Sequence, residues 1–381
     1  MKHGWEYKKL GEVATFINGY AFKPDQWKES GYPIVRIQNL NNPNAPYNYF
    51  DGDVPNNIII QNGDLLISWS ASLGVYIWNR GKAFLNQHIF KVVFDKMDID
   101  KFFLKYAVTS KLETMAGQVH GATMKHIVKK DFDNTLIPLP PKSTQQLIVA
   151  ELDKINELIR LKKEQLEDYD RLAQSIFYDM FGDPVENEKG WERKILKEIV
   201  SEDCSISYGI VQPGDGVENG VPVVRPVDMT GTFVLRQGLK NTTKEISDSY
   251  KRTILKGNEI LMCVRGTTGI VAMASMELQG CNVTRGVTPI ECGLSCNKWF
   301  IYYQLLNPSI QQYIAGHTRG ITLKQINMKD VRDIPLILPP LSLQRLFAQR
   351  IEQMERQKEE VKKAITDLET LLASRMQYWF E

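Results

Sequence analysis

The most constraining feature of this 381-residue sequence is that five blocks of residues occur twice, in the same order. Chance similarity between segments rich in β-branched residues would not preserve that order, so the sequence predicts an internal duplication, which a pseudo-two-fold axis can relate. The block pairs are GWE (4–6 and 190–192), GYPIVRIQNL (31–40) with GVPVVRPVDM (220–229), NGDLLISWSASLG (62–74) with KGNEILMCVRGTTG (256–269), AGQVHGATMKHI (116–127) with AGHTRGITLKQI (315–326), and IPLPPKSTQQL (137–147) with LILPPLSLQRL (336–346).

The first part of each repeat has the composition and the apolar pattern of a mainly β domain. Residues 1–140 and 185–339, which we call the first and second heads, are rich in glycine, asparagine, threonine and aromatic residues. Short apolar runs such as Ile58–Ile60 and Leu65–Ile67 are separated by turn-forming residues, as in strands. We also expect one helix in each head, around Lys101–Met115 and around Lys298–Ala315.

The second part of each repeat, residues 141–182 and 340–381, changes to a helical period. Prolines close each head, and beyond them apolar residues recur at alternating steps of four and three, the pattern of a coiled-coil helix. Adding 199 to a position in the first helix gives its counterpart in the second. The predicted packing residues are Ile148, Leu152, Ile155, Ile159, Leu166, Tyr169 and Ile176, and Phe347, Ile351, Met354, Val361, Ile365, Leu368 and Leu372.

These two sequence patterns predict an α+β fold: two mainly β domains with short helices, separated by two long helices that form an antiparallel coiled coil. The alternative is that each helix simply covers its own β domain. A formal net charge of +2 excludes a protein that binds nucleic acid through bulk charge alone. No run of apolar residues is long enough for a signal peptide or a membrane span, so we expect a soluble, cytoplasmic protein.

The motifs of several enzyme classes are missing from the sequence. There is no phosphate-binding G-x-x-x-x-G-K-[ST] loop, no G-x-G-x-x-G dinucleotide turn, and no Asn/Asp-Pro-Pro-aromatic tetrapeptide of amino-methyltransferases. Cys292 and Cys296 lie four residues apart, but no second pair completes a zinc site. We therefore expect a binding or assembly component with no catalytic residues, no metal and no cofactor of its own.

The loops of the heads carry side chains suited to DNA. Asparagine and glutamine pair with adenine and arginine pairs with guanine, while threonine and lysine contact phosphates. The repeats place Trp69 opposite Val264, Ser70 opposite Arg265 and His88 opposite Thr284, so similar scaffolds carry different side chains. Ordinary loop polarity remains the alternative for any one residue. The candidate DNA contacts are Arg36, Trp69, Ser70, Ser72, Asn86, Gln87, His88, Thr123 and Lys125 in the first head, and Arg225, Arg265, Thr267, Thr268, Asn282, Arg285, Arg319, Thr322 and Lys324 in the second.

The order head, Leu-Pro-Pro, long helix, repeated once, resembles the specificity subunit of type I restriction–modification systems. The resemblance covers essentially the whole chain and includes the Trp-x-x-x-x-Leu-x-Glu opening, the GYPIVRI segment and the LPPxSxQ junction. It implies that each head is a target recognition domain for one half of a bipartite, asymmetric DNA site, and that the helices set the spacing between the halves.

The same resemblance implies the partners. Two methyltransferase subunits would dock on the helices and heads, and restriction subunits with translocase and nuclease activity would complete the enzyme. Those partners would use S-adenosylmethionine, and ATP with Mg²⁺, while this chain binds none of them. Two alternatives from other classes are a repeat-built protein–protein adaptor without DNA binding and a self-contained nuclease.

Overall fold

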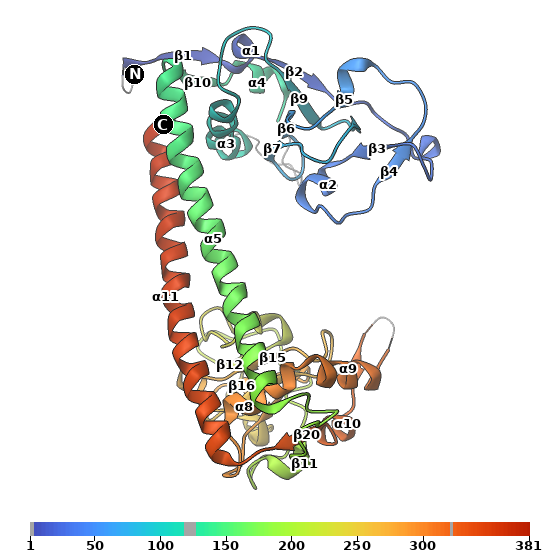
Figure 1. Ribbon diagram of the computed structural model, residues 1–381, viewed down its shortest axis with the longest axis vertical. Helices are drawn as coiled ribbons and strands as arrows, with labels where there is room; N and C mark the ends of the chain where they lie inside the picture. Colours follow the sequence, from blue (N-terminus) through green and yellow to red (C-terminus); the bar gives the residue numbers. More distant parts are fainter. Residues whose placement is uncertain (1–3, 118–126, 321–322) are drawn as a thin grey trace. The chain divides into compact units, whose positions relative to one another are not determined.

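The computed structural model describes residues 4–117, 127–320 and 323–381 (Figure 1). Contacts divide the chain into two compact units, each holding one head and a segment of each long helix. The first unit comprises Met1–Lys163 and Lys363–Glu381, and the second comprises Glu164–Lys362. No helix among the described residues is both long enough and apolar enough to cross a membrane.

In the first head, the described strands form two four-stranded sheets and a two-stranded ribbon. One sheet has the order β2-β9-β6-β7 and is antiparallel throughout, the other has the order β4-β3-β8-β5, and β1 pairs with β10. The strands are β1 (Glu6–Lys9), β2 (Thr15–Asn18), β3 (Tyr32–Val35), β4 (Asn48–Phe50), β5 (Ile59–Ile60), β6 (Leu65–Ser68), β7 (Gly74–Ile77), β8 (Ala83–Leu85), β9 (Ile89–Val93) and β10 (Leu136–Leu139). The helices are α1 (Leu10–Val13), η2 (Pro24–Gln26), α2 (Ile37–Asn41), η3 (Asn56–Ile58), α3 (Lys101–Gly117) and α4 (Lys129–Asn134).

The second head repeats this plan, but its two larger sheets have three strands each instead of four. Its described strands form the orders β13-β12-β16, β15-β14-β17, β11-β20 and β18-β19. The strands are β11 (Glu192–Ile195), β12 (Val221–Val224), β13 (Lys240–Thr242), β14 (Ile260–Cys263), β15 (Val271–Met273), β16 (Asn282–Val283), β17 (Val287–Ile290), β18 (Thr318–Arg319), β19 (Gln325–Ile326) and β20 (Pro335–Leu338). The helices are α6 (Leu196–Ile199), η4 (Pro226–Asp228), α7 (Lys244–Asp248), η5 (Lys251–Thr253), η6 (Met276–Leu278), α8 (Lys298–Leu306), α9 (Pro308–His317) and α10 (Met328–Arg332).

The central strand of each head is buried on both faces, which explains its unbroken apolar run. In β6, Leu65 and Ile67 join the core under α3, while Leu66 joins a separate core with the second sheet. In β14, Ile260 and Met262 alternate with Leu261 in the same way. Successive side chains of a strand point to opposite faces, so a strand between two cores is apolar at every position.

The duplication extends to individual backbone hydrogen bonds. Five bonds of the first head recur in the second, with N to O distances between 2.7 and 3.2 Å. Gly19 and Gly209 both approach the equivalent backbone closely, since a Cβ atom would lie 2.5 Å from Leu85 O and 2.2 Å from Val283 O. The paired bonds are Tyr20 N–Leu85 O with Ile210 N–Val283 O, Gln87 N–Tyr20 O with Arg285 N–Ile210 O, Asn86 N–Val35 O with Thr284 N–Val224 O, Trp69 N–His88 O with Val264 N–Gly286 O, and Ile127 N–Trp69 O with Ile326 N–Val264 O.

The expected single helix around Lys298–Ala315 is wrong, because the structure has two helices there. Asn307 ends α8 and caps α9, its Oδ1 accepting a hydrogen bond from Ser309 N at 3.0 Å. Pro308 is the first residue of α9, where its missing N–H costs nothing, but it cannot continue α8. In the first head, where no such proline occurs, α3 runs unbroken from Lys101 to Gly117.

The long helices are α5 (Lys142–Phe181) and α11 (Leu341–Phe380), each of 40 residues. The glutamine of each LPPxSxQ junction fixes the start of its helix. Gln145, 2% exposed, accepts a hydrogen bond from Asp100 N at 2.8 Å and donates to Pro140 O at 2.9 Å. Gln344, fully buried, does the same with Asn297 N and Pro339 O. Each junction is thereby tied to the start of the head's own helix, α3 or α8.

Within each unit, segments of α5 and α11 pack side by side in opposite directions. In the first unit Glu151 pairs with Arg375, and Lys163 pairs with Glu369 at 2.8 Å. In the second unit Asp170 pairs with Lys358 at 2.7 Å, and the Phe177 and Phe347 rings lie 5.6 Å apart. In both units, an α5 residue that comes later in the sequence contacts an α11 residue that comes earlier. Every residue of the two predicted packing sets is buried or partly buried.

Candidate nucleic-acid interface

In the second head, the loop after β14 meets the β18–β19 hairpin. Gly266 N donates a hydrogen bond to Lys324 O at 2.8 Å, and Ile326 N donates to Val264 O at 3.0 Å. Residues 284–286 join the same place, because Val264 N donates to Gly286 O at 2.8 Å. Four of the predicted contacts are thus brought together by backbone bonds between distant segments: Arg265, Arg285, Arg319 and Lys324. We call these four residues the second tip.

The second tip has cationic groups that the head does not neutralise. Within the described part of the chain, the Arg265, Arg319 and Lys324 side chains make no hydrogen bond or ion pair. The Arg285 guanidinium lies 5.7 Å from the centre of the Tyr208 ring, a cation–π contact that leaves its charge intact. Unpaired cations on a half-exposed or exposed surface attract an anion such as a phosphate backbone.

A cavity of about 270 Å³ adjoins the second tip. Its lining includes Gly266, Thr267, Thr268 and Lys324. Thr267 is exposed, whereas the Thr268 hydroxyl lies 3.0 Å from that of Thr318 and is therefore already hydrogen-bonded. Thr267 is the better donor or acceptor for a ligand.

Two predicted contacts of the second head are committed to the protein itself. The Arg225 guanidinium makes a bidentate pair with Asp228, at 3.0 Å from Nε and 2.7 Å from Nη2, and these hydrogen bonds raise the pKa of the guanidinium. Asn282 is completely buried, and its side chain bonds with Thr253 Oγ1 at 2.7 Å and Ser247 Oγ at 3.0 Å. We leave both residues out of the contact set proposed below.

Asn282→Ala should therefore reduce stability and leave DNA specificity unchanged. The substitution removes the side-chain acceptor of Val283 N and the donor to the buried Ser247 hydroxyl, and each lost buried partner costs about 1–3 kcal/mol. We expect a fall of roughly 2–4 kcal/mol in the free energy of unfolding, measured by urea denaturation. Gln279→Ala, an exposed amide nearby, is the control and should change it by less than about 0.5 kcal/mol. A changed DNA motif with unchanged stability would contradict the structural role.

In the first head the corresponding loops carry polar and aromatic groups. Ser72 and Gln87 are exposed, Trp69, Asn86 and His88 are half-buried, and Ser70 is 8% exposed. The Ser68 hydroxyl donates to Ser72 O at 2.6 Å and so shapes the loop that holds Ser70 and Ser72. We call Trp69, Ser72, Asn86, Gln87 and His88 the first tip.

Arg36 is partly committed inside the first head. Its Nη1 donates to Asn48 Oδ1 at 3.3 Å, and its guanidinium lies 5.4 Å from the centre of the Trp27 ring. Thr123, Lys125 and Thr322 lie outside the described residues.

The hydrogen bonds correct one of the predicted correspondences between the heads. Trp69 is equivalent to Val264, and Ser70 therefore to Arg265, as expected. The pairing of His88 with Thr284 is wrong, because the equivalent bonds match His88 with Gly286, Asn86 with Thr284 and Gln87 with Arg285. At one equivalent position the first head has Gln87 and the second has Arg285. At another the first head has Ser70 and the second has Arg265.

The structure adds two residues that the sequence did not single out. Tyr208 supports the Arg285 guanidinium, and Gln325 Nε2 donates to the Tyr208 hydroxyl at 3.2 Å. Gln325 follows the predicted contact Lys324 in a repeated block, so the sequence could have identified it as a candidate. Tyr208 carried no such signal, because it lies far from the tip in sequence.

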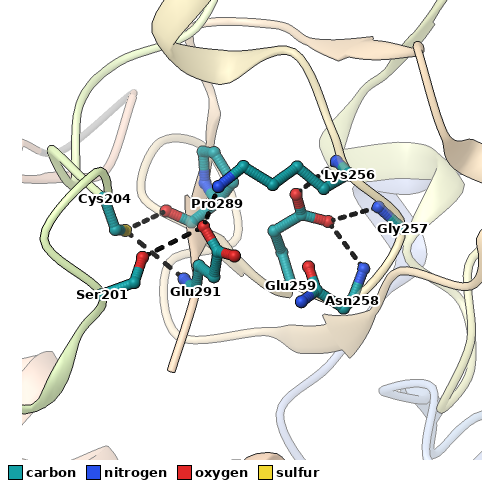
Figure 2. A network of polar contacts seen from close by, with 8 residues as sticks. All are labelled: Ser201, Cys204, Lys256, Gly257, Asn258, Glu259, Pro289 and Glu291. Atoms are coloured by element: carbon teal, nitrogen blue, oxygen red, sulfur yellow. Dashed lines mark hydrogen bonds and ion pairs between the residues drawn. The ribbon is translucent and has the colours of Figure 1, made fainter. Parts of the chain in front are cut away.

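A cluster of polar side chains at the other end of β14 and β17 has a structural role (Figure 2). The buried Glu259 carboxylate accepts hydrogen bonds from three successive backbone N–H groups, those of Lys256, Gly257 and Asn258. Glu291 accepts from Lys256 Nζ at 2.7 Å and from the Ser201 hydroxyl at 3.0 Å, and its own N–H bonds to Cys204 Sγ at 3.3 Å. Among the described residues, no group of three or more histidine, cysteine, aspartate or glutamate side chains is placed to hold a metal ion.

A family model covers most of the chain and decides its family. The model for the type I restriction modification DNA specificity domain matches residues 2–168 and 188–370. The chain belongs to this family. The two matches coincide with the two repeats and confirm the resemblance inferred from the duplicated motifs.

Individual family members are similar along nearly their whole length. The type I restriction enzyme EcoBI specificity subunit of Escherichia coli is 24% identical, with 95% of this chain and 82% of the relative covered. The MjaVIII specificity subunit of Methanocaldococcus jannaschii is 22% identical, with 97% and 92% covered. These names favour neither alternative, the adaptor or the self-contained nuclease.

Solved structures confirm an α+β fold with an internal repeat. A chain from a study of complex assembly and conformational transition of the type I R-M system has a TM-score of 0.60 and 20% identity, covering 99% of this chain and 97% of its own. The type I S subunit from M. genitalium has a TM-score of 0.51 and 15% identity, covering 99% and 96%.

Proposed function

We propose that this chain is the DNA sequence-recognition subunit of a type I restriction–modification complex. One observation carries the proposal: the same backbone hydrogen bonds recur in both heads, while the side chains that they present differ. A shared scaffold with different tips is what two recognition domains for two different half-sites require. Each head would recognise one half of a bipartite, asymmetric site.

The chemistry of the tips favours different bases. Arginine pairs bidentately with guanine O6 and N7, whereas asparagine and glutamine pair with adenine N6 and N7. The second tip has Arg265 and Arg285 where the first head has Ser70 and Gln87. We infer that the second half-site contains guanine at one or more positions contacted by these arginines.

Substituting the tip arginines should therefore alter one half-site. Arg285→Gln gives the second head the residue that the first head has at that position. We expect methylation of the original site to become slower, because the substitution removes about 1–3 kcal/mol of discrimination against the wrong base. The change in base preference should be confined to one base pair of the second half-site. Methylation rates on duplexes with single base-pair changes measure this effect.

Arg252→Gln is the matched control for that experiment, since Arg252 is an exposed arginine of the same head outside the second tip. It should leave base preference unchanged. Equal effects of the two substitutions would show that Arg285 contributes only general charge.

We also propose that α5 and α11 together form an antiparallel coiled coil that sets the distance between the half-sites. The opposed helix contacts within each unit and the buried packing residues support this. Two methyltransferase subunits would dock on the helices and heads and use S-adenosylmethionine, and restriction subunits would use ATP with Mg²⁺. On this proposal the chain itself binds none of these cofactors and is not catalytic.

Methylome sequencing of cells with and without the gene tests the proposed function. We expect one motif, made of two defined half-sites and an undefined spacer, to lose adenine methylation when the gene is deleted. Unchanged methylation at every motif, in cells that express the methyltransferase partner, would contradict the proposal.

A further inference from the structure

The helix pair of the second unit contains a buried lysine. Lys358 occupies a packing position of α11 and is 5% exposed. Its Nζ lies 2.7 Å from Asp170 Oδ1, 2.7 Å from Glu355 Oε1 and 3.5 Å from Thr232 Oγ1. An ammonium group has three N–H donors, so these three oxygens account for all of them.

The three partners of Lys358 come from three different parts of the second unit. Asp170 lies on α5, Glu355 on α11, and Thr232 in the second head. Thr232 is itself bound to a sheet, because Met273 N in β15 donates to Thr232 O at 2.7 Å. That sheet also contains β14 and β17, the strands that flank the loops of the second tip. One ammonium group thereby connects both long helices to the sheet that supports the tip.

The first unit shows that helix packing does not require this charge. The residue 199 positions before Lys358 is Ile159, which is 8% exposed in an apolar packing position. The counterpart of Asp170 is Glu369, which instead pairs with Lys163 in solvent, the two side chains being 50% and 57% exposed. Of these two equivalent packing positions, only the one in the second unit therefore carries a buried charge.

Burial of an ion pair is a poor source of stability. Burial by itself would lower the pKa of Lys358, but the hydrogen bonds with Asp170 and Glu355 outweigh it and hold the pKa above its ordinary value. Replacing such a pair with well-packed apolar residues is often neutral or stabilising, whereas the charged groups restrict the geometry of what they join. The contacts of Lys358 therefore indicate that it restricts the geometry of the elements that it joins and is not there for stability.

We propose that Lys358 is a positioning residue that fixes the direction of the second head against the long helices, and thereby restricts the number of base pairs allowed between the two half-sites. This inference rests on the proposed function. Without the link, the head retains its tip and its base preference but can turn on the helices, so sites with altered spacers become acceptable.

The test uses the full chain assembled with its methyltransferase partner. Methylation rates are measured on three duplexes that share both half-sites and differ in the spacer, which has its native length or is one base pair shorter or longer. The variant is Glu355→Gln with Lys358→Met, which removes the cation without leaving the buried Glu355 charge unpaired. We expect the preference for the native spacer to fall by about tenfold. The rate on the native duplex and the melting temperature should change little.

Lys163→Met is the matched control, because it removes the exposed ion pair between the same two helices in the first unit. It should leave the spacer preference unchanged. Thr232→Val is a second variant that keeps the Lys358 pairs with both carboxylates and removes only the hydroxyl of the head. It should lower the spacer preference in the same direction, by a smaller factor.

An unchanged spacer preference in both the double variant and Thr232→Val would overturn the inference. An equal loss in Lys163→Met would overturn it as well, because any ion pair between the helices would then suffice. Failure of the wild-type complex to methylate a bipartite site would instead contradict the proposed function.

Discussion

Exchanging the first head, residues 1–140, for that of another specificity subunit is expected to change one half of the methylated motif and leave the other half unchanged. The first head has its own core between its two sheets, formed by Ile34, Leu66, Phe84 and their neighbours, all from within the exchanged residues. It also has its own tip. Sequencing of methylated motifs in cells that carry the exchanged gene measures the result.

The donor head should keep the residues through which the first head contacts the long helices. Trp5 stacks on Trp379 with ring centres 5.9 Å apart, and the Tyr106 hydroxyl donates to Asp153 at 2.6 Å. Loss of these contacts would confuse a folding defect with a change of specificity. The reciprocal exchange of residues 185–339 is the control, and should alter only the other half. A change in both halves after either exchange would show that the heads do not recognise DNA independently.

The duplication and the long helices were predictable because their signals are redundant. Each packing position of one helix has a counterpart 199 residues away, so an accidental match at one position cannot shift the register. The break between α8 and α9 was missed although Pro308 marks it, because α3, the helix of the first head, is continuous and suggested the same for the second.

The wrong correspondence between the two heads arose because side-chain identity is a weaker guide than backbone pairing. Asn86 and Asn282 are the same residue type, and this identity shifted the alignment of the tips by two positions. The backbone bonds match Asn282 with Phe84, another buried position of its strand. Arg225 is different, since the aspartate three residues later that neutralises it was visible in the sequence.

The second tip itself could not be assembled from the sequence. Its members come from segments after β14, before β17 and around the β18–β19 hairpin, and only long-range hydrogen bonds bring them together. The sequence identified Arg265, Arg285, Arg319 and Lys324 as candidates by residue type. Residue type alone does not separate them from Arg225, although Asp228, three residues later, marks that arginine as internally paired.

Leu166→Pro should abolish most of the methylation activity by breaking α5. Leu166 lies well inside the 40-residue helix, with its side chain half-buried. Proline there removes the N–H that bonds to the carbonyl four residues earlier and clashes with that carbonyl, at a cost of about 3 kcal/mol or more. If the helices set the distance between the half-sites, a kinked α5 misplaces them, and the rate on the native duplex should fall at least tenfold, as about 1.4 kcal/mol of that cost suffices.

Two controls separate helix continuity from other effects of the substitution. Lys142→Pro puts proline at the first residue of α5, where it is tolerated, and removes only an exposed ion pair with Asp98. Leu166→Ala removes packing but keeps the helix, so it should reduce stability without a comparable loss of methylation. Full activity of Leu166→Pro on the native spacer would contradict the spacer role of α5, because two recognition heads joined through a broken helix would then still bind half-sites a fixed distance apart.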